Sequence, residues 1–159
     1  MRILDSNLII YSALPEFAYL RPLLKEPDSH VSAISTLEVL GFRQLDPKSK
    51  AYFESVFFSL TVLPISDQVL RIAIDLRQQR KLSLGDAIIA ATALHYNLNL
   101  HTRNTSDFDW IPNLFTTNPI RWFGFTIGRF LSSIFCDYAI ALDVLAHLLI
   151  TKYYPKNAQ

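Results

Sequence analysis

The sequence of 159 residues is poor in cysteine, in glycine and in net charge. Its single cysteine, Cys136, excludes an intramolecular disulfide and a cysteine-rich metal site, and it fits a reducing compartment. Half of the residues are hydrophobic, 18% are charged and four are glycine, which excludes disordered and collagen-like chains. With a net charge of +1, the protein would have to bind a polyanion through a local patch or through metal ions. We expect a globular, cytoplasmic protein.

The sequence also lacks the motifs of several enzyme classes. It has no glycine-rich phosphate-binding loop, and its four histidines do not have the spacing of a zinc site. No serine has a partner histidine at a spacing that suggests acyl transfer. Asp5 interrupts any basic-then-apolar secretory signal, so no export signal is expected. Nucleotide-cofactor, zinc and serine-hydrolase chemistry are therefore without support.

Short apolar runs alternate with amphipathic segments along the first 119 residues. Strands are expected at residues 2–4, 30–34, 61–65, 97–101 and 114–116. Helices are expected after residues 5–7, after a Ser-x-x-Glu capping box at 35–38, at 47–60, at 67–80 and after a second capping box at 83–86. This alternation predicts an α/β protein with a central parallel sheet between two layers of helices, in an α/β/α arrangement.

Four acidic residues follow the expected strands or lie just beyond them, namely Asp5, Glu38, Asp86 and Asp107. Each has a local structural explanation, because Asp5 can cap a helix, Glu38 and Asp86 can complete capping boxes, and Asp107 can lie in an exposed turn. A parallel sheet, however, brings the carboxyl ends of neighbouring strands to one edge, where ligands bind. We therefore expect the four carboxylates to converge in one cleft.

Such convergence requires a compensating positive charge. Two carboxylates about 5 Å apart repel by roughly 3 kcal/mol at an effective dielectric constant near 20, so the group would take up protons or bind a cation. An oxygen-only site favours Mg²⁺ or Mn²⁺, which leave coordination positions open for water and phosphate oxygens. That chemistry suits hydrolysis of a phosphodiester bond by metal-activated water.

Four segments carry a resemblance to the signature blocks of PIN-domain ribonucleases, particularly VapC-type toxins, and they occur in the family's order. They are residues 4–11 (LDSNLIIY), 34–41 (ISTLEVLG), 84–94 (LGDAIIAATAL) and 102–108 (TRNTSDF). Asn118-Pro119 resembles the ending common in that family, so the resemblance covers residues 1–119. Ser6 stands where many relatives carry threonine, and no acidic position of the pattern is missing.

The resemblance implies a PIN-like fold and a metal-dependent endoribonuclease that hydrolyses RNA. It would also imply a homodimer and an antitoxin protein that holds the toxin inactive. By this similarity the catalytic and metal-binding residues are the four acids, with Asn7, Thr102 and Asn104 as polar neighbours. The implied cofactor is Mg²⁺ or Mn²⁺, and no other cofactor is expected.

Basic residues near the expected site are candidate RNA contacts. Arg103 lies inside the loop of the last block, although it could instead pair with a site carboxylate. Arg80 and Lys81 end a basic run that could steer RNA toward Asp86. Cations at the end of a helix also complement the helix dipole, so a solvated face is the competing interpretation of this run.

After Pro119 the composition changes, and residues 120–159 are expected to form a separate, apolar and mainly helical extension. Its apolar residues recur at helical spacing between residues 130 and 150. Membrane contact through this extension is disfavoured, because Asp137 and Asp143 would each cost about 3 kcal/mol near the bilayer centre. We expect it to pack against protein, across a dimer in the first instance, although an extension without a selected role stays open.

Two alternative functions belong to other classes. A haloacid-dehalogenase-like phosphatase also begins with a strand that ends in Asp, but it needs a second Asp where this sequence has Asn7, which cannot exchange a proton at neutral pH. The other alternative is a non-cleaving interaction module that keeps the fold and binds an antitoxin or RNA. Metal-dependent cleavage of RNA separates the nuclease from the module.

Overall fold

Five parallel strands form the central sheet, in the order β3-β2-β1-β4-β5. The computed structural model describes residues 1–120 of the chain. The expected helical extension at residues 120–159 lies outside the described residues, apart from Ile120. The strands are β1 (Arg2–Leu4), β2 (Ser29–Ser32), β3 (Thr61–Leu63), β4 (Asn99–His101) and β5 (Thr116–Thr117). The predicted parallel sheet is confirmed, and every strand lies within three residues of its expected position.

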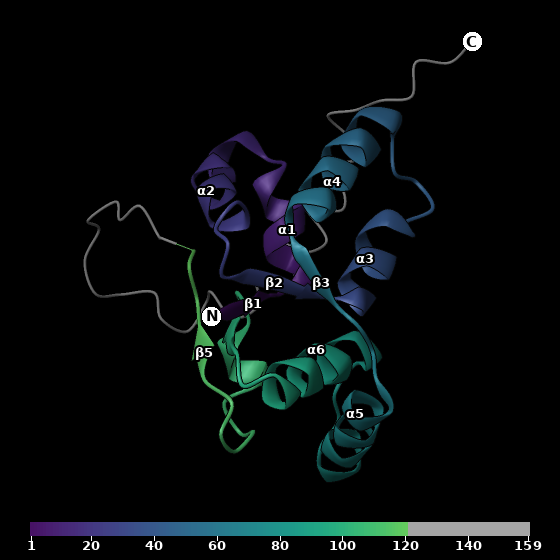
Figure 1. Ribbon diagram of the computed structural model, residues 1–159, viewed down its shortest axis with the longest axis vertical. Helices are drawn as coiled ribbons and strands as arrows, with labels where there is room; N and C mark the ends of the chain where they lie inside the picture. The colour runs from purple at the N-terminus through teal and green to yellow at the C-terminus, as the bar shows by residue number, and fades with distance from the viewer. Residues whose placement is uncertain (121–159) are drawn as a thin grey trace, which may run out of the picture. The chain divides into compact units, whose positions relative to one another are not determined.

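Helices cover both faces of this sheet, so the predicted three-layer α/β/α arrangement is confirmed (Figure 1). In the view of Figure 1, α1 to α4 lie on one side of the sheet and α5 and α6 lie on the other. The α-helices are α1 (Ser6–Ser12), α2 (Arg21–Leu24), α3 (Ala33–Leu40), α4 (Pro47–Ser59), α5 (Asp67–Gln79) and α6 (Leu84–His95), and the 3-10 helices are η1 (Pro15–Leu20) and η2 (Thr105–Asp107). Among the described helices, none is long and apolar enough to cross a membrane.

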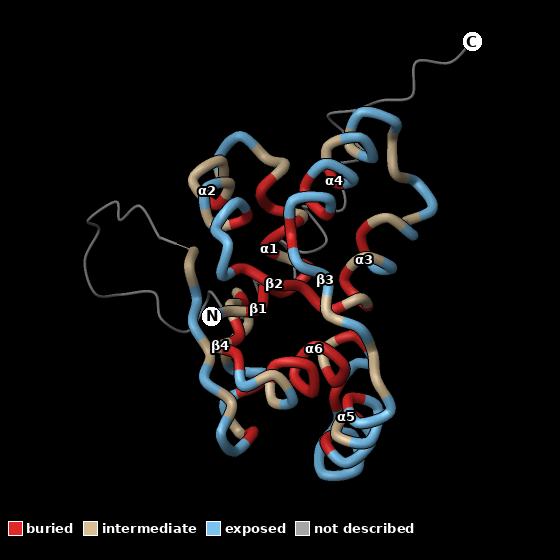
Figure 2. The backbone as a smooth tube through the Cα atoms, viewed as in Figure 1, coloured by how far each residue is buried: buried red, intermediate tan, exposed pale blue. Residues whose placement is uncertain are grey.

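The core lies where the central strands meet the helices, as the buried segments in Figure 2 show. Ile3 of β1 pairs in register with His30 of β2 and with Leu100 of β4. Ile3 and Leu100 are fully buried, as is Val31 on β2. Strand β2 is also buried at all four positions, although three of them are the polar residues Ser29, His30 and Ser32.

Helix α6 is the most deeply buried helix of the described chain, because small residues let it approach its neighbours closely. Its alanines at positions 87, 90, 91 and 93 are fully buried. Thr92 Oγ1 donates a hydrogen bond to the Ile88 carbonyl at 2.7 Å, and the Ser32 hydroxyl at the end of β2 lies 3.1 Å from Thr92 Oγ1. This buried contact fixes α6 against β2, so the first turn of α6 is held at the carboxyl edge of the sheet.

The predicted capping box at residues 35–38 was wrong. Strand β2 ends at Ser32, and α3 begins at Ala33 with Ser32 as its extended N-cap residue. Ser35 therefore lies inside the helix, where its buried hydroxyl has no hydrogen-bond partner among residues 1–120. The earlier start places Ile34, Ser35 and Val39 on the buried side of α3, and burial of that face outweighs the local capping preference.

The sequence analysis also missed the segment that connects β1 to β2. After α1 the chain forms η1 and α2, two short helices that both have proline in their first turn. Proline at the start of a helix was the available signal, because its missing N–H and fixed φ suit that position. These helices pack against α1 and each other, and they do not contribute to the acidic cleft described below.

Candidate acidic site

Asp5 lies at the base of the site, at the point where β1 turns into α1. Its backbone N–H donates to the His101 carbonyl at 2.9 Å, and its extended backbone makes it the N-cap residue of α1. The carboxylate accepts hydrogen bonds from Thr102 Oγ1 at 2.6 Å and from the Asn7 backbone N–H at 3.4 Å. Only 3% of Asp5 is exposed. The helix-capping interpretation is thus confirmed, but burial at the edge of the sheet goes beyond what capping needs.

Glu38 reaches the same region from α3. Its Oε2 accepts a 2.5 Å hydrogen bond from the hydroxyl of Ser6, the residue next to Asp5. Its carboxylate also lies against Gly85 in the first turn of α6, where a β-carbon would come within 1.9 Å of Glu38 Oε1. Glycine at position 85 therefore leaves the space that the Glu38 carboxylate occupies.

Asp86 is placed by the start of α6. The hydroxyl of Ser83, the N-cap residue, accepts a hydrogen bond from the Asp86 N–H at 3.0 Å and donates to Asp86 Oδ2 at 2.5 Å. The predicted cap at residues 83–86 is therefore confirmed, although the carboxylate accepts from the Ser83 hydroxyl instead of its backbone. This pair of bonds holds the Asp86 carboxylate at the helix N-terminus, where negative charge is favoured.

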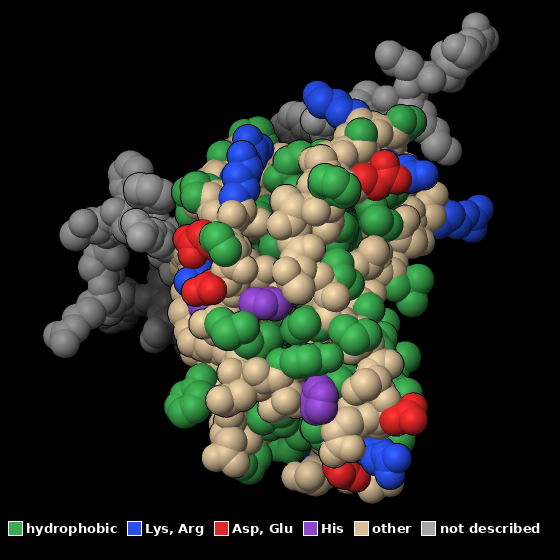
Figure 3. Space-filling view, in the orientation of Figure 1, with side chains coloured by type: hydrophobic (Ala, Val, Ile, Leu, Met, Phe, Trp, Pro, Cys, Tyr) green, Lys and Arg blue, Asp and Glu red, His purple; other side chains and the backbone are tan. Residues whose placement is uncertain are grey.

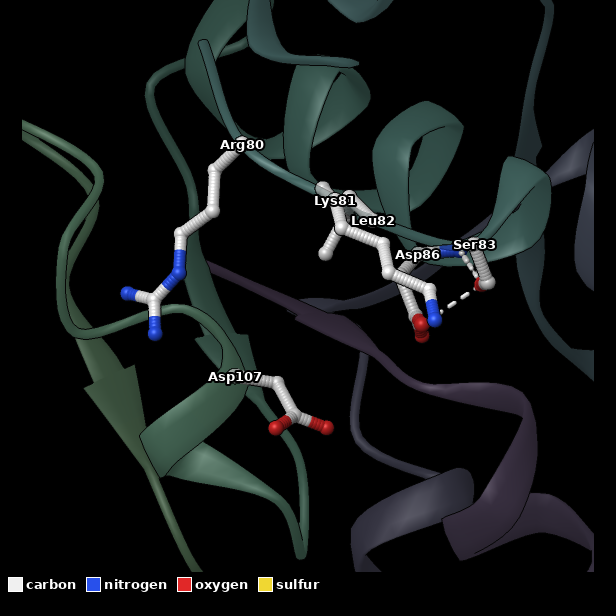
Figure 4. Close-up of a pocket in the computed structure, with 6 residues that line it drawn as sticks. All are labelled: Arg80, Lys81, Leu82, Ser83, Asp86 and Asp107. Atoms are coloured by element: carbon white, nitrogen blue, oxygen red, sulfur yellow. Dashed lines mark hydrogen bonds between the residues drawn. The ribbon is translucent and has the colours of Figure 1, made fainter.

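Asp107 lies on the exposed side of the site, at the end of η2 in the loop that follows β4. Together with Asp86 it lines a cleft of about 240 Å³ whose other walls come from the segment between α5 and α6. The lining residues are Arg80, Lys81, Leu82, Ser83, Asp86 and Asp107 (Figure 4). In this view Arg80 extends from the end of α5 toward the loop that carries Asp107. The cleft therefore has acids and cations on neighbouring walls.

Electrostatic coupling links the four acids. Burial, together with the charges of Asp86 and Glu38, raises the pKa of Asp5 from 3.8 to about 6 against the opposing hydrogen bonds from Thr102 and Asn7. Burial also raises the pKa of Asp107, where the charge of Asp86 adds to the effect and that of Arg80 opposes it. The charge of Asp86 acts on both Asp5 and Asp107, and the charge of Glu38 acts on Asp5. Of the four acids, only Asp86 and Asp107 line the cleft, so convergence of all four in it stays a prediction.

The three polar residues predicted to neighbour the acids, Asn7, Thr102 and Asn104, make different contacts. Thr102 is fully buried, and its Oγ1 both donates to Asp5 and accepts the Asn104 backbone N–H at 3.1 Å. Asn7 contacts the Asp5 carboxylate through its backbone. Thr102 therefore connects the loop after β4 to the base of the site, whereas Asn7 and Asn104 take part through backbone N–H groups.

Arg103 is held beside α1. Its guanidinium donates to the Tyr11 hydroxyl and lies 5.5 Å from the centroid of the Tyr11 ring. The Arg103 carbonyl accepts a hydrogen bond from the Asn118 side chain at 3.3 Å. Arg103 thus ties the site loop to α1 and to the end of the described chain.

Trp110 is a site neighbour that the sequence analysis missed. Its indole Nε1 donates to the Asp107 carbonyl at 2.9 Å, and the Arg80 guanidinium lies 5.8 Å from its ring centroid. The closeness of Trp110 to Asp107 in the sequence was the available signal. Its approach to Arg80, thirty positions earlier, depends on the fold.

The donor set fits Mg²⁺ or Mn²⁺ in its chemistry, because it consists of carboxylates and hydroxyls around a buried acid with a raised pKa. Among residues 1–120, no three His, Cys, Asp or Glu side chains lie close enough together to hold a metal ion. Mg²⁺ is commonly held by one or two carboxylates, with water and substrate phosphate completing its coordination. The arrangement fits that kind of site and does not form an all-protein cage.

Charge elsewhere on the described surface is mixed. On the face drawn in Figure 3, basic and acidic side chains are interspersed, with no single region of one sign. The two ion pairs found within residues 1–120, Arg2–Glu26 and Lys50–Glu54, lie outside the acidic cleft. The cations at the cleft are therefore a local feature, as the net charge of +1 requires.

Comparison with known proteins gives one family and a consistent set of structures. The family model of the PIN domain matches residues 2–112. A toxin–antitoxin complex from Klebsiella pneumoniae has 29% identity and a TM-score of 0.63, covering 77% of this chain and 100% of that chain. FitAcB from Neisseria gonorrhoeae has 25% identity and a TM-score of 0.62, covering 75% and 98%. VapBC-1 from nontypeable Haemophilus influenzae has 25% identity and a TM-score of 0.60, covering 74% and 96%.

The search of curated proteins found no match. The family model nevertheless spans more than half of the chain, and its range contains all four acids of the site. The similar structure from Klebsiella pneumoniae is a toxin–antitoxin complex. Sequence family and fold agree, and the chain belongs to the PIN domain family.

Proposed function

We propose that this chain is a Mg²⁺- or Mn²⁺-dependent endoribonuclease and the toxin of a toxin–antitoxin pair. The observation that carries the proposal is the Asp5 carboxylate, which is buried at the end of β1 next to two further acids. A carboxyl group in such surroundings is costly unless it is protonated or a cation is bound nearby. Membership of the PIN domain family and the likeness to toxin–antitoxin complexes support the same function.

In this proposal the four acids have distinct positions. Asp5 supplies a buried anionic oxygen at the end of β1, Glu38 is held near it by Ser6, and Asp86 and Asp107 supply carboxylates that line the cleft. The bound cation would supply positive charge that lowers the pKa of a water molecule and offsets charge on the phosphate. Thr102 holds the Asp5 carboxylate in one orientation through its 2.6 Å hydrogen bond. Arg80, Lys81 and Arg103 are the proposed RNA contacts.

The proposed partners are an antitoxin protein and a second copy of the chain. The similar structure from Klebsiella pneumoniae is a toxin–antitoxin complex, which supports an antitoxin partner. We also propose that residues 120–159 form a unit separate from the nuclease domain at 1–119. All of the proposed site residues precede the boundary.

The test is cleavage of a panel of single-stranded RNAs by the purified full chain, with the cut ends mapped. We expect cleavage with Mg²⁺ or Mn²⁺, its loss in EDTA, and its return when either ion is added back. Cleavage that persists without any divalent ion would contradict the metal dependence. Activity restored by Zn²⁺ alone would point to histidine ligands, and hydrolysis of small phosphomonoesters without cleavage of RNA would point to a phosphatase.

A non-cleaving interaction module is the second candidate. It is favoured by one observation, namely that within residues 1–120 no three His, Cys, Asp or Glu side chains lie close enough together to hold one metal ion. Such a module would bind RNA or an antitoxin but would leave every RNA of the panel intact with each metal. The same assay therefore separates the two functions.

A further inference from the structure

We propose that Arg80 and Trp110 form a stacking subsite for one base of a single-stranded polynucleotide, with Lys81 contacting an adjacent phosphate. This inference rests on the proposed nuclease function, because the subsite adjoins the same acidic cleft. The substrate class is a single strand whose bases are free to leave their own stack. RNA and DNA share that chemistry, and the experiment below distinguishes them.

Trp110 has the placement of a stacking residue. Its ring is partly buried against the hydrophobic core, so its position is fixed on that side. The indole N–H donates to the carbonyl of Asp107, which fixes the ring relative to that acid. A ring tethered to an acidic residue of the site would hold a base one or two nucleotides away from the reacting phosphate.

Arg80 supplies the second layer of the subsite. Its side chain is exposed, and its guanidinium lies 5.8 Å from the centroid of the Trp110 ring. A guanidinium plane and an aromatic ring both stack on bases, and the contribution does not depend strongly on base identity. The backbone of Arg80 is extended at the end of α5, so the side chain leaves the helix toward the cleft.

The cations of the cleft are available for phosphate. Arg80 and Lys81 both line the cleft, and neither takes part in an ion pair with another of residues 1–120. Asp86 and Asp107 line the same cleft, so a polyanion that enters it would have Arg80 and Lys81 as its cationic contacts there. These contacts would orient the strand with a phosphate at Lys81 and a base toward Arg80 and Trp110.

A duplex cannot place a base in this subsite unless it is locally opened. Its bases are stacked and paired, so presenting one to Trp110 costs a few kcal/mol of unstacking and unpairing. Single strands have no such cost, and base–aromatic stacking stabilises their complexes by about 1–3 kcal/mol per base. The subsite therefore predicts a preference for single strands over duplexes of the same sequence.

The experiment measures binding of fluorescently labelled oligonucleotides to the full chain in EDTA, so that binding is observed without cleavage. Single-stranded RNA, single-stranded DNA and double-stranded RNA of one sequence are compared. We expect both single strands to bind more tightly than the duplex. Arg80→Ala and Trp110→Leu should each weaken binding of the single strands about tenfold. Lys81→Ala should lower the slope of log affinity against log salt by about one unit.

Three controls separate stacking from charge and from loss of the fold. Arg71→Ala removes one exposed cation of α5 outside the cleft, so it should leave affinity close to the wild-type value. Arg80→Lys keeps the positive charge but loses the planar guanidinium group, so its affinity should lie between those of Arg80→Ala and the wild type. Thermal unfolding checks each variant, and leucine keeps an apolar group against the core at position 110. Quenching of tryptophan fluorescence by the oligonucleotide should decrease in Trp110→Leu, since Trp122 is the only other tryptophan.

Several results would overturn the subsite. One is a wild-type chain that binds no oligonucleotide, and another is equal affinity for duplex and single strand. The others are wild-type affinity in correctly folded Arg80→Ala and Trp110→Leu, and an affinity of Arg80→Lys equal to that of the wild type. Tighter binding of RNA than of DNA would identify RNA as the ligand, and equal binding would assign the subsite to single strands of both kinds. Binding that depends on Arg80 and Trp110 in a chain that cuts nothing would keep the subsite and reject the nuclease.

Discussion

The acidic site has an inner wall, whose residues do not line the cleft, and an outer wall that carries the cations of the cleft, and the two differ in burial, in bonding and in charge. The inner wall consists of Asp5, Glu38, Gly85 and Thr102, where side chains are fixed by hydroxyl hydrogen bonds and by close contact with α6. The outer wall consists of Arg80, Lys81, Asp107 and Trp110, where the cations and Asp107 are exposed. Burial therefore changes the chemistry of Asp5 and Thr102 in the inner wall, whereas Glu38 and the cations of the outer wall are exposed.

This comparison indicates that the two walls have different roles in the proposed function. A buried carboxylate with a pKa near 6 suits a metal-dependent reaction, because it binds a cation in preference to remaining an uncompensated charge. Exposed cations next to an aromatic ring suit binding of a flexible polyanion. Variants of the inner wall should change cleavage, and variants of Arg80, Lys81 and Trp110 in the outer wall should change affinity.

The largest effect is expected from Asp5→Asn, which removes the central charge of the inner wall. A carboxamide keeps the shape and can accept the hydrogen bond from Thr102, but it cannot act as an anionic ligand. We expect cleavage of RNA to fall below detection while the fold is kept, as measured by a cleavage assay and by circular dichroism. Asp75→Asn, which changes an exposed acid of α5 in the same way, should cleave normally. Wild-type cleavage by Asp5→Asn would remove Asp5 from the proposed site.

Gly85→Ala tests whether the packing of Glu38 against α6 matters. The new methyl group would come within 1.9 Å of Glu38 Oε1, so the carboxylate must move away from its place beside Ser6. Displacement of a catalytic group by about 1 Å can reduce a rate by up to about a hundredfold. We expect kcat to fall in that range with little change in oligonucleotide affinity.

Thermal unfolding is the control for Gly85→Ala, because alanine stabilises a helix by up to about 1 kcal/mol relative to glycine. The variant should therefore unfold no earlier than the wild type. If kcat stays at the wild-type value, Glu38 does not need its position against Gly85. If affinity falls together with kcat, the two walls are not separate in function.

The raised pKa of Asp5 predicts a dependence of stability on pH in metal-free protein. A group whose pKa is higher in the folded state favours folding when it is protonated, and this contribution is lost as pH rises through the folded-state value. For a shift from 3.8 to about 6, the loss between about pH 4 and pH 6 is at most about 3 kcal/mol. Asp5→Asn should therefore be more stable than the wild type at pH 7 and similar to it near pH 4.

Denaturant unfolding in EDTA at several pH values measures this difference. At each pH the free energy of unfolding of the wild type is subtracted from that of the variant. This difference is needed because other acids stabilise the fold more as the pH rises. Asp46, for example, caps α4, and its pKa is lowered by hydrogen bonds from the Ser49 side chain and from the N–H groups of Ser49 and Lys48, so its contribution is lost on acidification. A difference that stays constant from pH 4 to pH 7 would contradict the raised pKa of Asp5.

The smallest effect on cleavage is expected from Ser83→Ala, which changes the N-cap residue of α6 and a lining residue of the cleft. Loss of this N-cap should cost about 1 kcal/mol in the free energy of unfolding. Asp86 also loses the hydroxyl that binds its carboxylate, so cleavage should fall several-fold. Ser66→Ala is the matched control, because Ser66 caps α5 through the Val69 N–H but lies outside the cleft. Equal cleavage by the two variants would show that Ser83 acts only as a cap.

The sequence by itself determined the features that depend on neighbouring residues. Alternating strands and helices, the caps at Asp5 and Ser83 and the four acidic positions were all recognisable, because each rests on local hydrogen bonding or on hydrophobic periodicity. The start of α3 could not be predicted in this way. It depends on where β2 ends, and β2 is set by its register with β1 and β3.

Only the tertiary structure decided the contacts between distant segments. The hydrogen bond from Thr102 to Asp5 joins residues 97 positions apart, and the contact of Glu38 with Gly85 joins α3 to α6. The same holds for Arg80 beside Trp110, which gave the site a residue that no motif indicated. The pKa of Asp5 is likewise a tertiary property, since the burial and the neighbouring charges that raise it come from segments brought together by the sheet.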